Sequence, residues 1–131
     1  QQLQLVRAMV RQLNLPLEII AGETARASDG LALSSRNRYL GSEERAEAVR
    51  LHRVLSEIKH AVGAGNRNFL QLCKNAHENL ASHGWEVDYI ALQQRDTLAP
   101  AGVDDPDLVV LAAARLGKTR LIDNLEVSAG A

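Results

Sequence analysis

Hydrophobic residues recur every three or four positions between residues 3 and 13, and this spacing is typical of one face of an amphipathic helix. Asn14 and Pro16 end the pattern, because proline cannot continue a helix. The next segment, 17–21, is short, mostly apolar and contains two isoleucines, which predicts a buried strand that ends at Gly22. The chain is therefore expected to begin with a helix followed by a strand.

Two further amphipathic helices are predicted in the middle of the chain. The first is expected to have Ser42 as its N-cap, to carry acidic residues in its first turn and to end at Gly63. The second is expected to be capped near Asn66 or Asn68 and to end around Gly84. Because only a short turn with glycine connects them, the two helices are predicted to be antiparallel.

The hydrophobic period changes in the last third of the chain. Apolar residues alternate with acidic ones over 85–91, which predicts a half-buried strand. Residues 108–114 are continuously apolar and predict a second strand, and 119–122 are expected to pair with it as a hairpin. A helical pair packed on a small, mostly antiparallel three-stranded sheet is an α+β fold. The last residues, 127–131, are expected to form a frayed tail.

Composition narrows the class of protein. The chain has 131 residues, 46% of them hydrophobic and 24% charged, which fits one globular domain. It has one cysteine, Cys73, so neither an internal disulfide nor a zinc cluster is expected, and a reducing, cytoplasmic setting is favoured. No apolar stretch approaches the ~18 residues that a membrane span needs. The chain starts at Gln1 rather than at Met, so we expect it to be a piece of a longer protein.

Other candidate motifs are incomplete. Gly117-Lys118-Thr119 matches the end of a phosphate-binding P-loop, but Ala112 stands where its first glycine belongs, and a hairpin turn is the better interpretation. The histidines lack metal-ligand spacing and are expected on helix surfaces: His52, His60, His77 and His83. Cys73 lies on the apolar side of its helix and is expected to be a buried, unreactive thiol. No metal site is predicted.

The most informative segment is the polar, irregular stretch 23–41. It contains the adjacent hydroxyls of Ser34 and Ser35, followed by Arg36, and Gly30 is expected to let the backbone approach a ligand. Hydroxyl and peptide groups can donate to phosphate oxygens, and Arg36 supplies positive charge where a polyphosphate leaving group gathers negative charge. On these residues alone, a polar loop with a capping network is the simpler interpretation, and a phosphate site is the alternative.

The run Asp29-Gly-Leu-Ala-Leu-Ser-Ser-Arg-Asn37, with Tyr39-Leu40 and Glu44-Arg45 after it, resembles the signature of the pantothenate synthetases, or pantoate-β-alanine ligases. Three further stretches resemble the family in the same order along the chain: 1–3, 96–98 and 117–124. The resemblance thus extends over nearly the whole chain.

The resemblance implies an ATP-dependent ligase that makes pantothenate in the coenzyme A pathway. In the family, the carboxylate of pantoate attacks the α-phosphate of ATP and gives pantoyl adenylate and pyrophosphate. The amine of β-alanine then displaces AMP. The implied ligands are therefore ATP, pantoate and β-alanine, with Mg²⁺ bound through the nucleotide. A cytoplasmic homodimer of the full-length enzyme is implied, and neither nucleic acid nor a membrane is expected as a partner.

The resemblance also implies roles for particular residues. Leu33, Ser34, Ser35 and Arg36 correspond to the lysine-serine loop of class I aminoacyl-tRNA synthetases, which grips the phosphates of ATP, and Arg36 stabilises the departing pyrophosphate. Ala25 corresponds to a residue that contacts ATP through its backbone. Gln2 corresponds to a glutamine that hydrogen-bonds pantoate.

The implied domain organisation is that of two connected parts. Residues 1–23 are expected to be the last helix and strand of a Rossmann-like nucleotide-binding domain, 24–127 a C-terminal lid domain, and 128–131 a disordered tail. The family's His-x-Gly-His motif, Lys-Asp pair and second pantoate-binding glutamine are absent, so the 131 residues alone are expected to be inactive.

A different class of function is the alternative interpretation. A non-enzymatic α+β module could bind an acidic partner or nucleic acid through the arginine-rich loop. The net charge of −1 and the presence of only four aromatic residues argue against an extensive nucleic-acid surface.

Overall fold

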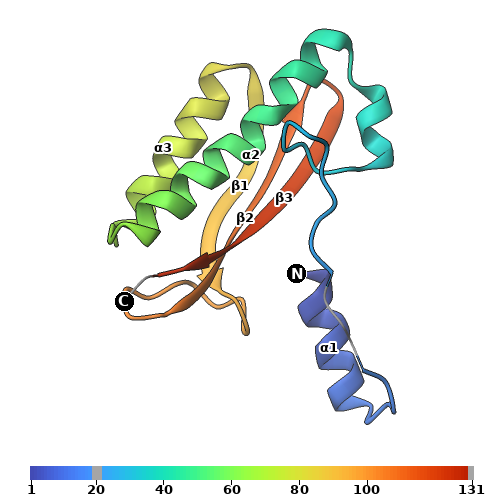
Figure 1. The fold of residues 1–131 in the computed structure, drawn as a ribbon, viewed down its shortest axis with the longest axis vertical. Helices are drawn as coiled ribbons and strands as arrows, with labels where there is room; N and C mark the ends of the chain where they lie inside the picture. Colours follow the sequence, from blue (N-terminus) through green and yellow to red (C-terminus); the bar gives the residue numbers. More distant parts are fainter. Residues whose placement is uncertain (19–21, 130–131) are drawn as a thin grey trace.

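The computed structural model describes residues 1–18 and 22–129, and its ribbon is shown in Figure 1. Within these residues the helices are α1 (Gln2–Gln12), α2 (Ser42–Gly63) and α3 (Phe69–Ser82), with a short 3₁₀-helix, η1 (Ser35–Tyr39). The strands are β1 (Trp85–Gln94), β2 (Asp107–Leu116) and β3 (Thr119–Ser128). Helices and an antiparallel sheet in separate parts of the chain confirm the predicted α+β class.

The three strands form an antiparallel sheet in the order β1-β2-β3, and α2 and α3 cover one of its faces (Figure 1). Alternate residues of β2, beginning at Leu108 and Val110, point toward these helices and pack against Leu55 and Leu80 in the core. The intervening residues, such as Leu111, are also buried although they face the other side of the sheet. Burial on both faces explains why the sequence of β2 is continuously apolar.

The predicted helices are confirmed, with one correction at a helix end. Asn68 caps α3, since its side chain accepts a hydrogen bond from the N–H of Gln71. Ser42 is not the N-cap of α2, because it is already helical and Gly41 holds the cap position. The carboxylate of Glu44 accepts the Gly41 N–H at 3.1 Å and so satisfies a backbone donor at the start of the helix.

The strand predictions are partly corrected. β3 extends well beyond the predicted 119–122, and the frayed tail is wrong for residues 127–129, because Val127 is 1% exposed and Ala129 donates its N–H to Pro106. Asp123 interrupts the apolar pattern of β3 and thereby hides the second half of the strand from sequence reasoning. The strand predicted at 17–21 falls largely on residues 19–21, which lie outside the described residues, as do 130 and 131.

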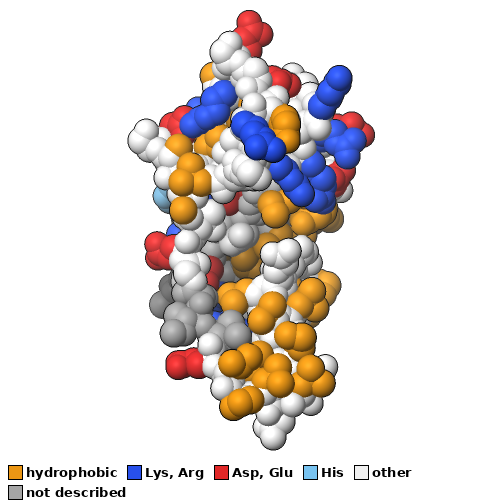
Figure 2. Space-filling model, turned by 90° about the vertical axis from the view of Figure 1, so that its right-hand side faces the viewer, with side chains coloured by type: hydrophobic (Ala, Val, Ile, Leu, Met, Phe, Trp, Pro, Cys, Tyr) orange, Lys and Arg blue, Asp and Glu red, His pale blue; other side chains and the backbone are white. Residues whose placement is uncertain are grey.

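Helix α1 stands apart from the sheet (Figure 1). None of its residues is buried: Leu5 is 70% exposed and Met9 47% exposed. Figure 2 shows the resulting concentration of hydrophobic side chains over this end of the molecule. The amide of Gln4 donates to the Arg95 carbonyl at 2.8 Å and the Tyr89 hydroxyl donates to Gln1 at 3.4 Å, so α1 is joined to the sheet mainly by polar contacts.

Across 1–18 and 22–129, none of the helices combines the length and the apolar character that crossing a membrane would demand.

Candidate functional site

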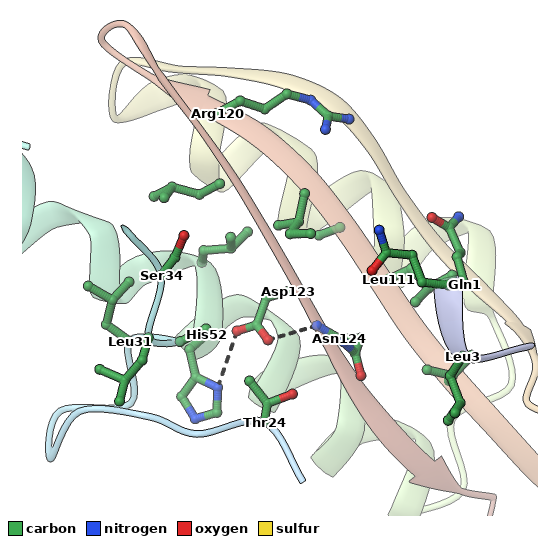
Figure 3. A pocket seen from close by; sticks show the side chains of 18 of the residues that line it. Gln1, Leu3, Thr24, Leu31, Ser34, His52, Leu111, Arg120, Asp123 and Asn124 are labelled. Carbon is green, nitrogen blue, oxygen red and sulfur yellow. Dashed lines mark hydrogen bonds and ion pairs between the residues drawn. The ribbon is translucent and has the colours of Figure 1, made fainter. Parts of the chain in front are cut away.

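A cavity of about 890 Å³ lies where three distant parts of the chain meet. Its walls come mainly from the loop 22–34, from β3 with its neighbour β2, and from the start of α1, and His52 and its neighbours on α2 also line it. Figure 3 shows Ser34 and His52 on one side of β3, and Gln1 and Leu3 on the other. The cavity therefore wraps around the edge of the sheet and is bordered by both the polar loop and α1.

The guanidinium of Arg26 fastens the loop to β3. Its two terminal nitrogens donate to the two carboxylate oxygens of Asp123 at 2.7 and 2.8 Å, and also to the carbonyls of Gly30 and Asn124 at 3.1 and 3.2 Å. The side chain of Asp123 is only 3% exposed and that of Arg26 18% exposed. A buried carboxylate needs such a paired cation, so the loop and strand depend on each other for their conformation.

The backbone of the loop folds back on itself between Arg26 and Ser34. Leu33 donates its N–H to the Ala25 carbonyl and Ala27 donates to the Leu31 carbonyl, both at 2.8 Å. Leu31 is buried in the core, and Gly30 takes a φ of +97° at the bend. This short antiparallel turn directs the following residues toward the cavity.

His52 of α2 lies at the base of this turn and was expected on the helix surface. Instead it is half-buried and lines the cavity. Its Nδ1 atom lies 3.8 Å from Asp123 Oδ2, and this nitrogen has no hydrogen-bond partner among the described residues. Burial lowers the pKa of His52, and the positive charge of Arg26 lowers it further, against the opposing effect of Asp123. The lowered pKa favours the neutral form of the ring.

Gly30 is needed for the close approach of His52, whereas the expected approach of a ligand to this glycine stays a prediction. A Cβ at this position would lie 2.5 Å from the Cδ2 atom of the imidazole, and the φ of +97° is one that residues with side chains rarely adopt.

The predicted site residues divide into two groups. Gln2 of α1 lines the same cavity as Leu33, Ser34 and Arg36, although they follow Gln2 by 31 or more positions in the sequence. Ala25 and Ser35 are exposed, but they are not among the residues that line the cavity.

Ser34 and Arg36 are connected by the geometry of η1. Ser34 is the N-cap of this short helix, and its Oγ accepts the N–H of Arg36 at 3.2 Å. The amide of Asn37 donates to the Ala32 carbonyl at 3.0 Å and ties η1 to the loop. The guanidinium of Arg36 is exposed and forms no ion pair or hydrogen bond within the described part of the chain, so it can bind an anion.

A second, smaller cavity of about 620 Å³ lies beside the first. It is lined by Arg36, Tyr39, Lys118, Thr119 and Arg120, and two of these residues, Arg36 and Arg120, also line the larger cavity. Figure 2 shows several basic side chains gathered at this end of the molecule. The sequence predicts a hairpin turn at Gly117-Lys118-Thr119, but it gives no sign that Lys118 and Arg120 lie beside Arg36.

The hairpin interpretation of that motif is confirmed. Gly117 has a φ of +60° in the turn between β2 and β3, and Thr119 begins a strand rather than a helix. Cys73 is half-buried rather than buried, and burial raises the pKa of its thiol, which lowers its reactivity at neutral pH. Across residues 1–18 and 22–129, no three histidine, cysteine or acidic side chains gather as metal ligands would.

Comparison with known proteins decides the family. The family model described as pantoate-beta-alanine ligase matches residues 1–126. The chain belongs to the pantoate-β-alanine ligase family. It is 63% identical over 128 residues to the pantothenate synthetase of Nitrosospira multiformis, covering 98% of this chain and 46% of the relative. It is 53% identical over 131 residues to that of Thiobacillus denitrificans, covering 100% and 46%.

Solved structures of the ligase family agree with the fold. The pantothenate synthetase of Thermus thermophilus has a TM-score of 0.88 and 36% identity, over 99% of this chain and 46% of the solved one. The enzyme of Francisella tularensis, solved with β-γ ATP and β-alanine, has a TM-score of 0.62 and 27% identity, over 95% of this chain and 39% of the solved one. The chain thus spans about half the length of its relatives and matches their C-terminal part.

Proposed function

We propose that residues 1–131 form the C-terminal part of an AMP-forming ligase, which condenses pantoate with β-alanine using ATP and gives pantothenate, AMP and pyrophosphate. The observation that carries the proposal is the cavity that Gln2 shares with Leu33, Ser34 and Arg36. In the proposal, Gln2 is the pantoate ligand and the Leu33–Arg36 segment binds ATP. A shared cavity would hold the attacking carboxylate close to the phosphates that it must reach.

In this proposal Ser34, Ser35 and Arg36 hold the triphosphate of ATP. When the pantoate carboxylate attacks the α-phosphorus, the bond to the bridging oxygen breaks and negative charge develops on the leaving pyrophosphate. A guanidinium free of ion pairs, as that of Arg36 is within the described residues, can stabilise this charge. The Ala25 carbonyl already accepts the Leu33 N–H, which leaves the Ala25 N–H for the nucleotide.

The second half of the proposed reaction is attack by the β-alanine amine on the acyl carbon of pantoyl adenylate, which releases AMP. Mg²⁺ would be bound through the nucleotide phosphates, whose oxygens it prefers as ligands. These activities need the part of the enzyme that precedes Gln2 in relatives of full length. We propose that the complete enzyme is a cytoplasmic homodimer.

We further propose a division at residue 23. The separation of α1 from the sheet supports assigning residues 1–23 to a Rossmann-like nucleotide-binding domain. Residues 24–127 would then be a lid that closes over ATP and excludes water.

The test is a chimera in which residues 1–131 replace the matching C-terminal part of the Nitrosospira multiformis enzyme. The chimera is expected to form pantothenate, whereas the 131-residue chain alone is not. Arg36→Ala in the chimera should slow adenylate formation by an amount corresponding to about 2–4 kcal/mol, with a much smaller effect on amine attack on preformed adenylate. Arg53→Ala is the matched control, because Arg53 is also exposed but lies on α2 away from both cavities.

Two results would contradict the proposal. Equal slowing of both half-reactions by Arg36→Ala would remove the assigned role of Arg36. Oligonucleotide binding with a steep salt dependence, together with an inactive chimera, would favour the non-enzymatic alternative instead.

A further inference from the structure

The smaller cavity collects positive charge from two separate elements. Arg36 comes from η1, whereas Lys118 and Arg120 come from the turn between β2 and β3 and from the start of β3. Arg36 and Lys118 are 82 positions apart in the sequence, so the fold itself brings these cations together. Like charges repel at close range, and such a grouping is stabilised when an anion binds between them.

Two acidic side chains face this cluster. Asp88 accepts a hydrogen bond from Nε of Arg120 at 2.7 Å, which neutralises part of its charge. Glu44 lies against Gly117, because a Cβ built on that glycine would collide with its carboxylate. Neither Lys118 nor Arg36 forms an ion pair within residues 1–18 and 22–129, so two of the three cations keep their charge available.

The position of Lys118 is fixed by the turn that carries it. Gly117 holds a φ of +60°, and the packing of Glu44 against Gly117 sets the turn beside the N-terminus of α2. Glu44 is held in turn by the N–H of Gly41. The flexible lysine side chain thus starts from an ordered backbone, which reduces the entropy lost when it contacts a ligand.

The cluster adjoins the proposed triphosphate site and opens beside it. Arg36 and Arg120 line both cavities, so the positive charge of the smaller cavity continues to the border of the larger one. We propose that Lys118 and Arg120, with Arg36, form a binding site for inorganic pyrophosphate, which receives this product after it leaves the α-phosphorus. The inference rests on the proposed function, since the ligase reaction is what produces pyrophosphate.

The experiment is a titration of inorganic pyrophosphate into the 131-residue chain, followed by calorimetry at low and moderate salt. Lys118→Gln is expected to weaken binding about three- to fivefold, as loss of one exposed charge contact should. Lys118→Arg keeps the charge and should retain most of the affinity. Lys74→Gln is the matched control, because it removes the same charge from the exposed surface of α3 and should leave binding unchanged.

The possible results separate this inference from the proposed function. Absence of saturable binding, or equal weakening by Lys118→Gln and Lys74→Gln, overturns the pyrophosphate site. If the chimera is active and Arg36→Ala slows adenylate formation, the proposed ligase function is supported. If Lys118→Gln then binds pyrophosphate as well as the unchanged chain does, this site is rejected. Binding that depends on Lys118 in a protein whose chimera is inactive supports the anion site and rejects the ligase.

Discussion

Replacing Asp123 by asparagine tests whether the buried ion pair holds the loop to the sheet. The carboxylate accepts two hydrogen bonds from Arg26 and one from the N–H of Asn124. Asparagine keeps one acceptor oxygen but places an amide against the guanidinium, and it removes the only negative charge paired with Arg26 in the described residues. Removing one partner of a fully buried pair destabilises proteins by roughly 3–5 kcal/mol.

The expected loss of folding free energy is about 2–3 kcal/mol, below that range because the Arg26 side chain retains 18% exposure to water. Asp88→Asn is the control. It breaks an ion pair with Arg120 of the same 2.7 Å length, but both of these side chains are 40% exposed and screened by water, so the loss should be much smaller than for Asp123→Asn. Urea denaturation with a constant m-value measures both changes. Similar losses for the two variants would refute the argument from burial.

Two further predictions concern the contact between Gly30 and His52. Gly30→Ala should destabilise the chain by about 2–4 kcal/mol, because it adds both backbone strain and a clash with the His52 ring. Gly65→Ala, at a φ of +106° with open space around it, should show the strain alone, and an equal loss at both glycines in thermal unfolding would contradict the clash. The pKa of His52 is lowered from 6.5 in the folded chain, so as the pH falls the unfolded chain binds a proton at this histidine before the folded chain does. The free energy of unfolding should therefore fall as the pH decreases below about 6.5. When urea unfolding is measured across pH 5–8, this decrease in stability should be absent in His52→Gln and still present in His77→Gln.

The helices, the first two strands and the hairpin between the second and third strands could be predicted because their signals are local. The spacing of apolar residues in α2 and α3 and the continuous run 108–114 depend only on neighbouring positions. The second half of β3 could not be predicted in this way. Asp123 is buried in that strand because Arg26, 97 positions away, neutralises it.

The candidate site shows the same division between local and distant information. The Ser34 to Arg36 run stands out in the sequence as a group of anion-binding side chains, and its family resemblance drew attention to Gln2. Nothing local indicates that His52 faces the loop or that Lys118 approaches Arg36. Those neighbours depend on how α2 and the β2–β3 turn pack against the loop, which is a property of the tertiary fold.

The exposure of helix α1 affects what the denaturation experiments above can measure. A helix of 11 residues that buries none of them has marginal stability in water, so its local unfolding requires little free energy. β2 is buried on both faces and opens only when the whole domain unfolds. Denaturation curves of this chain therefore measure the unfolding of the sheet with α2 and α3, and they do not measure the unfolding of α1. Gln2 lies in α1, so a ligand that binds Gln2 must also supply the free energy that orders this helix.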